Sequence, residues 1–117
     1  MSGSTEASLQ TLQENLGIKD TIDLLVFALP RIRERQQALH QCLQARDWEE
    51  ASRVAHQTLS SVRLYGSSQI EQLLQAVRQQ DIGVISSASF QQSLVQEFES
   101  VTHTVKTWLA KHTVCTQ

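Results

Sequence analysis

The sequence predicts an all-α fold, namely an antiparallel four-helix bundle with an additional short N-terminal helix. The first reason is composition: the 117 residues include only four glycines and one proline, and long stretches consist of Gln, Glu, Arg, Leu and Ala, which favour helices. The second reason is spacing, because apolar residues recur every three or four positions over most of the chain. A chain of this length can bury the core of one domain without metal ions or disulfides.

The chain is expected to begin with a short helix. We predict a flexible N-terminus at residues 1–5 and a helix over about residues 6–16, which Gly17 ends. One side of this helix carries Leu9, Leu12 and Leu16. The bundle domain as a whole is predicted to span residues 6–113, followed by a C-terminal tail at 114–117.

The next helix is expected to start at the cap residue Asp20 and to continue to about Arg46. Its apolar positions, which keep a helical period, are Ile22, Leu25, Val26, Leu29, Ile32, Leu39 and Leu43. Pro30 lies inside this run. Because proline has no amide N–H, we expect a kink there or two abutting pieces.

A capping box formed by Asp47 and Glu50 predicts a helix from Trp48 to about Tyr65. Gly66 is expected to end this helix as a left-handed C-cap. The short connections between these helices favour antiparallel neighbours.

Two further helices complete the predicted bundle. Ser68 and Glu71 are expected to cap a helix that runs through about Gln80, with a core face of Ile70, Leu73, Leu74 and Val77. Residues 81–89, DIGVISSAS, are predicted to be a loop. The last helix carries a seam of apolar residues that ends with a histidine: Phe90, Leu94, Phe98, Val101, Val105, Trp108 and His112.

Charge and cysteine content exclude several classes of function. With a net charge of −2, nothing favours nucleic acid or an anionic membrane as a partner. Cys42 and Cys115 form no CxxC motif and are interpreted as reduced thiols. No run of 18 apolar residues occurs, and the polar start is not typical of a signal peptide. We therefore expect a cytoplasmic protein, with a monomer as the simplest state.

A histidine on the helix at 48–65 is the main candidate for chemistry. At about 100° per residue, His56 falls about 140° from Ala51, which marks the core stripe, and Ser60 and Arg63 share its side. We expect His56 to face solvent, with the small residues Ser60 and Ser61 leaving its ring accessible to another protein. Arg63 could offer a guanidinium to a phosphate on the ring. The alternative is that His56 is an ordinary solvated polar residue.

The residues around His56 form a recognisable pattern. Ala55 directly precedes the histidine, Ser60 and Ser61 follow it by four and five positions, and Gly66 by ten. This pattern resembles that of the histidine-containing phosphotransfer (HPt) domain family of multistep two-component relays. The stretch DTIDLLVFALPRIRERQQALHQCLQARDWEEASRVAH resembles the family's second helix and the approach to the histidine, and GSSQIEQLLQAV resembles the helix that follows. The resemblance covers roughly residues 9–112.

The resemblance implies a phosphoryl carrier without autonomous catalytic activity. The neutral imidazole of His56 would accept a phosphoryl group from, and return it to, an aspartate of a response-regulator receiver domain or a hybrid sensor kinase. The protein would need no cofactor, because the partner receiver domain is expected to hold Mg²⁺, and no metal site of its own is predicted. An ATP site is not expected either, since the chain has no glycine-rich phosphate loop or Walker motif.

The same resemblance assigns roles to neighbouring residues. Ser60 and Arg63 would lie beside the phosphoryl group, and Gly66 would be structural. The residues expected to contact the partner are Leu59, Ser61, Gln72 and Gln75, and Gln79 is a further candidate for a hydrogen bond to the phosphoryl group.

Two positions depart from the family pattern. Thr58 stands where the family has leucine, and its hydroxyl is expected to bond a carbonyl one turn back. Leu59 stands where the family has a lysine that helps to hold the phosphoryl group. Arg63 would compensate for that charge, while Leu59 would give the docking face an apolar contact. The departure keeps open an alternative, a degenerate HPt-like adaptor that binds a receiver or kinase without being phosphorylated.

Two other classes of function find little support in the sequence. A metal or haem bundle needs inward Glu-x-x-His pairs or a CxxCH motif, and the chain has neither. A hydrolase would need a Ser/His/Asp arrangement or a nucleophile elbow, which the chain does not show. Phe90, Phe98 and Trp108 have the spacing of core residues and are not taken as a cofactor site.

Overall fold

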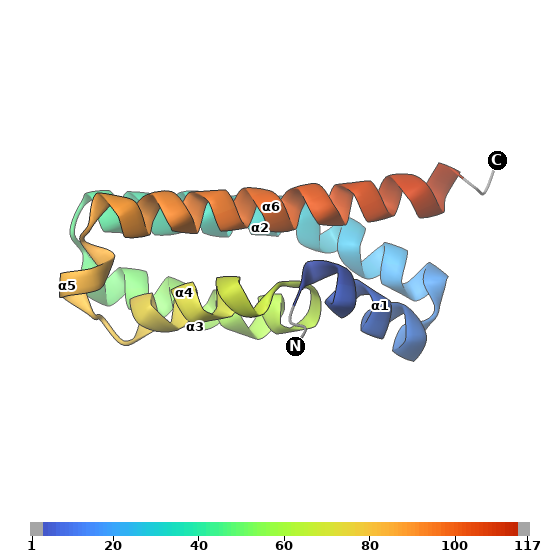
Figure 1. The fold of residues 1–117 in the computed structure, drawn as a ribbon, viewed down its shortest axis with the longest axis horizontal. Coiled ribbons are helices and arrows are strands. Elements are labelled where there is room, and N and C mark those ends of the chain that lie inside the picture. The colour runs from blue at the N-terminus through green and yellow to red at the C-terminus, as the bar shows by residue number, and fades with distance from the viewer. Residues whose placement is uncertain (1–3, 115–117) are drawn as a thin grey trace.

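The computed structural model describes residues 4–114, and within that range all regular secondary structure is helical (Figure 1). The helices are α1 (Thr5–Leu16), α2 (Ile18–Gln44), α3 (Trp48–Tyr65), α4 (Ser68–Arg78), α5 (Ile82–Ile85) and α6 (Ala88–Val114). The predicted all-α class is therefore confirmed for this part of the chain. No helix in it is both long enough and apolar enough to cross a membrane.

The N-terminal helix starts earlier than predicted. Ser4 caps α1, its hydroxyl accepting from the Ala7 amide at 3.1 Å, and Thr5 is already helical and buried. The prediction of a flexible segment at 1–5 is thus wrong for residues 4 and 5, and residues 1–3 lie outside the described range. At the other terminus α6 reaches Val114, the first residue of the predicted tail, and Cys115 lies outside the described residues.

One glycine joins α1 directly to α2. Gly17 adopts φ +84°, a conformation that side chains with a Cβ disfavour, so the chain can reverse without a longer loop. Because Gly17 also serves as the N-cap, α2 starts at Ile18, ahead of the predicted cap Asp20.

Pro30 does not divide α2 into two helices. The assigned helix is continuous from Ile18 to Gln44, and Pro30 is exposed. Figure 1 shows that α2 runs alongside α6 over much of its length and then slopes away toward its N-terminal end. Such a bend is what a missing amide donor inside a helix produces.

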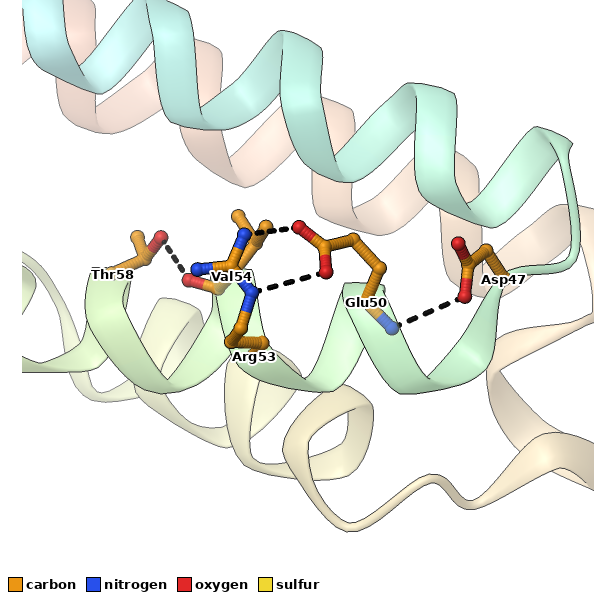
Figure 2. Close-up of polar contacts among 5 residues, drawn as sticks. All are labelled: Asp47, Glu50, Arg53, Val54 and Thr58. Atoms are coloured by element: carbon orange, nitrogen blue, oxygen red, sulfur yellow. Dashed lines mark hydrogen bonds and ion pairs between the residues drawn. The ribbon is translucent and has the colours of Figure 1, made fainter.

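The start of α3 follows the predicted cap in part (Figure 2). The Asp47 carboxylate accepts from the Glu50 amide at 3.2 Å, as an N-cap should. The Glu50 carboxylate, however, does not return to the cap residue but pairs with Arg53. Further along, the Thr58 hydroxyl donates to the Val54 carbonyl at 2.7 Å, which confirms the expected bond one turn back.

Gly66 ends α3 for a different reason from the one predicted. Its φ of −97° and ψ of −172° are extended and open to any residue, so the predicted left-handed cap is wrong. What requires glycine here is space. A Cβ would lie 2.8 Å from the Val62 carbonyl oxygen and 3.0 Å from Cγ2 of Ile70.

The predicted bounds of α4 and the following loop also need correction. The cap of α4 is Ser67, whose hydroxyl accepts from the Ile70 amide at 3.1 Å, and Ser68 is the first helical residue. The helix ends at Arg78, two residues short of the predicted end. The predicted loop at 81–89 contains the short helix α5.

The seam predicted on α6 lies in the core, except at its C-terminal end. Its first five members are buried: Phe90, Leu94, Phe98, Val101 and Val105. Beyond them Leu109 is buried instead of Trp108, whose half-buried ring stacks on His112 with 3.9 Å between ring centroids.

Two antiparallel helix pairs organise the core. α3 packs mainly against α4, and α2 packs mainly against α6 (Figure 1). Gln44 near the end of α2 bonds Gln91 near the start of α6 at 3.0 Å. Buried apolar side chains from all six helices form one continuous cluster between the pairs.

Gly66→Ala should destabilise the protein by about 1–3 kcal/mol, because the new methyl group overpacks the α3–α4 contact. The matched control is Gly83→Ala, since a Cβ there meets nothing within 4 Å and helical alanine is favoured over glycine. Urea denaturation of both variants measures the change. Equal stability of the two variants would show that Gly66 is not closely packed.

Candidate functional site

His56 lies on the exposed side of α3. The buried residues of this helix are Ala51, Val54, Ala55, Thr58, Leu59, Val62 and Tyr65, and they cover an arc of about 140° on the helix surface. His56 lies about 60° beyond the edge of that arc, which Leu59 marks, and it is exposed. Among residues 4–114, no hydrogen bond or ion pair occupies its imidazole. The ring nitrogens are therefore accessible for chemistry.

Two contacts join α3 to α4 on the side of α3 that carries His56, one before the histidine along the helix and one after it. One turn before the histidine, the Ser52 hydroxyl donates to the Arg78 carbonyl at 2.6 Å. Two turns after it, Nε of Arg63 lies 3.9 Å from a carboxylate oxygen of Glu71. Because the helices are antiparallel, the level of His56 corresponds to about residues 74–78 of α4.

Gln75 and Arg78 are the polar α4 residues at this level on the flank that faces α3. They share that flank with Glu71, since all three lie within about 60° of one another on the helix. Arg78 is exposed, and its Nη1 donates to the Gln75 side-chain oxygen at 3.4 Å. The register thus places a cation and an amide of α4 at about the level of His56, on the flank of α4 that faces α3. Gln75 was predicted from the sequence to contact the partner, whereas Arg78 was not predicted to belong to the site.

The position of Arg78 follows from the α3–α4 turn. The turn between the helices is short, so residues at equal distances from it face each other across the hairpin. His56 lies about ten residues before this turn. The residues about ten positions after the turn form the last turn of α4, so the sequence itself contained a signal for Arg78.

Ser60 and Arg63 lie on the expected side of α3. Ser60 is exposed one turn after His56, and the Arg63 side chain is 56% exposed. Arg63 lies two turns away, about 10 Å along the helix axis, and Glu71 lies within 4 Å of it. Along the helix axes, the level of Arg78 is therefore closer to that of His56 than the level of Arg63 is.

The prediction that Leu59 contacts a partner is wrong, because only 2% of its surface is exposed. The reason is that α4 packs against α3. The buried surface of α3 is therefore wider than the stripe centred on Ala51 that the spacing of apolar residues predicts, and it includes Leu59. Leu59 belongs to the core cluster together with Val62 and Leu74.

Ser61 and Gln72 are not brought to His56 either. Ser61 is half-buried and lies about 140° from His56 around α3, where its side chain bonds the Tyr65 phenol. Burial raises the pKa of that phenol, and Arg35 and Ser61 partly oppose the rise. Gln72 and Gln79 are exposed on the outer side of α4, away from the flank that adjoins α3.

A second arginine lies near His56 on α3 itself. Arg53 is one turn before the histidine, but its guanidinium is engaged by both carboxylate oxygens of Glu50 (Figure 2). That hydrogen bond lowers the pKa of Glu50 and raises the pKa of Arg53. The pair keeps Glu50 charged and holds Arg53 in place.

The remaining histidines lie in other surroundings. His40 and His103 line a groove between α2 and α6, and Nδ1 of His112 lies 2.8 Å from the Trp108 carbonyl oxygen. Over the described part of the chain, no three His, Cys, Asp or Glu residues are placed to hold a metal ion. Of the four histidines, His56 is the one on α3, the helix that packs mainly against α4.

This arrangement can support group transfer to a ring nitrogen. It offers a nucleophile that another macromolecule can reach, a cation that can neutralise an incoming anion, and hydroxyl and amide groups for hydrogen bonds.

Comparison of the chain with protein-family models, with curated proteins and with solved structures finds no match.

Leu59→Lys should destabilise the protein by about 3 kcal/mol, because it places an ammonium group in the core without a partner. The control Ser60→Lys, at the next position on the exposed side, should change the free energy of unfolding by less than about 0.5 kcal/mol. Chemical denaturation of both variants distinguishes the two positions. Similar stabilities would mean that residue 59 is accessible after all.

Proposed function

We propose that the chain is a histidine phosphotransfer protein of a multistep two-component phosphorelay, and that its helices form the antiparallel four-helix bundle of that family with α1 added. His56 would accept a phosphoryl group from the aspartate of a receiver domain and donate it to another. The proposed partners are a response-regulator receiver domain and a hybrid sensor kinase, which would place the protein in the cytoplasm.

The observation that carries this proposal is the position of His56. The ring is exposed, it is free of hydrogen bonds within the described residues, and the helix register puts Gln75 and Arg78 of the neighbouring helix at about its level. A histidine whose role was structural would be expected to use its ring nitrogens in the fold, as His112 does with the Trp108 carbonyl. The family resemblance of the segment 55–66 supports the same residue independently.

The proposed reaction is a reversible exchange between two carriers. A lone pair on a nitrogen of the neutral His56 imidazole attacks phosphorus, an N–P bond forms and the P–O bond to the partner's aspartate breaks. The aspartate leaves as a carboxylate with the electron pair. The partner would supply Mg²⁺, and this chain would contribute the nucleophile, the Arg78 charge and the hydrogen bonds of Ser60 and Gln75.

A second function is favoured by a specific observation. Where the family has a lysine, this chain has the buried Leu59, so no charged side chain stands three residues after the histidine. An adaptor that binds a receiver or kinase without being phosphorylated would not need that charge.

His56→Gln should abolish labelling when the protein is incubated with a panel of receiver domains charged with radiolabelled acetyl phosphate. The wild type and the control His40→Gln should both acquire acid-labile, base-stable label, because His40 lies in the α2–α6 groove. Label that persists in His56→Gln would refute the assignment. Receiver binding without any label would favour the adaptor.

Arg78→Gln should lower the initial rate of labelling about tenfold, the value of one charge-assisted hydrogen bond to the transferred group. The fold should be unaffected, because Ser52 bonds the backbone carbonyl of residue 78 and the side chain is exposed. Arg31→Gln, which removes an exposed arginine from α2, should leave the rate unchanged. Equal rates in all three proteins would show that Arg78 does not act on the phosphoryl group.

A further inference from the structure

A polar groove runs between α2 and α6, the helix pair that does not carry His56. Its volume is about 750 Å³, and the lining includes Arg33 and His40 from α2 together with Glu99, His103 and Lys106 from α6. Three glutamines of α2 and a single apolar side chain, Val95, make up much of the remaining wall. The groove is therefore suited to a polar ligand.

Basic side chains enter this groove from both walls and have no partner in the fold. Within residues 4–114, no ion pair or hydrogen bond reaches Arg33, His40, His103 or Lys106. Glu99 is the one acidic residue of the lining, and it lies more than 4 Å from every basic group of the groove. Arg33 and Lys106 are thus two cations without an ion-pair partner on one face of a protein whose net charge is −2.

The helix register gathers three of these groups at one end. The bond between Gln44 and Gln91 fixes the antiparallel pair, so Arg33 lies level with about residues 102–103 of α6. Arg33, His103 and Lys106 therefore share one end of the groove, and His40 lies about 10 Å further along α2. The basic groups are spread along a line, as an extended ligand would require.

We infer that this groove binds an acidic peptide segment of a partner protein. Carboxylates of the segment would meet Arg33, His103 and Lys106, and the amide side chains of Gln36, Gln37 and Gln41 could pair with its backbone. A single small anion would use only one end of the groove. A nucleic acid would need more cations than the few basic side chains of this lining to offset its dense phosphate charge.

The groove and His56 lie on different helix pairs, so both can be occupied together. The inference does not depend on phosphorylation of His56: an acidic segment would bind equally to a phosphoryl carrier or to an adaptor. If His56 does carry phosphate, the groove gives the protein a second attachment point for a partner.

The test is a titration of the full chain with an octaglutamate peptide at low salt, followed by NMR of the backbone amides. We expect shifts centred on residues 33–41 and 99–106. In Arg33→Gln/Lys106→Gln the dissociation constant should rise at least about fivefold. The control Lys19→Gln/Arg31→Gln removes the same charge from exposed positions of α2 outside the groove, and it should stay within about twofold of wild type.

Three results would overturn the inference. One is equal weakening in the two double variants, which would indicate attraction by overall charge. Another is a set of shifts outside the α2–α6 groove. The third is tighter binding of inorganic tripolyphosphate or of a single-stranded oligonucleotide at the same residues, which would assign the groove to phosphate groups instead. Circular dichroism of both double variants verifies that they remain folded.

Discussion

The close contact between α3 and α4 at Gly66 is the constraint on which the site depends. The Val62 carbonyl and the Ile70 side chain approach the Gly66 Cα so closely that a Cβ would lie within 3.0 Å of both. This approach, together with the Ser67 cap, sets the direction and register of α4 along α3. Because the register is fixed at the turn, the last turn of α4 necessarily reaches the level of His56.

The burial of one side of α3 limits which of its side chains can be charged or accessible near His56. Leu59 and His56 lie only about 60° apart on the helix, yet one is sealed in the core and the other is open to solvent. A charge at position 59 would have to displace core packing, so a charge near the imidazole must come from elsewhere. The α4 helix that packs against α3 also carries Arg78, so the packing that buries Leu59 brings the last turn of α4 to the level of His56.

The two helix pairs divide the surface between two kinds of chemistry. The α3–α4 pair presents the exposed His56 imidazole at about the level of a cation and an amide, whereas the α2–α6 pair presents basic groups along a polar groove. Since one apolar cluster joins the pairs, the two surfaces are held by the same core while remaining separate in space.

The sequence by itself determined the helical class, most of the helix positions, the Asp47 cap, the Thr58 bond and the exposure of His56. These features depend on local periodicity and on hydrogen bonds within one or two turns, which residue order specifies directly. Tertiary structure alone decided that Leu59 is buried, that Gly66 is needed for space and that the last turn of α4, with Arg78, reaches the level of His56. Each of these depends on how closely and in what register a second helix packs against the first, and a periodicity measured along one helix does not contain that information.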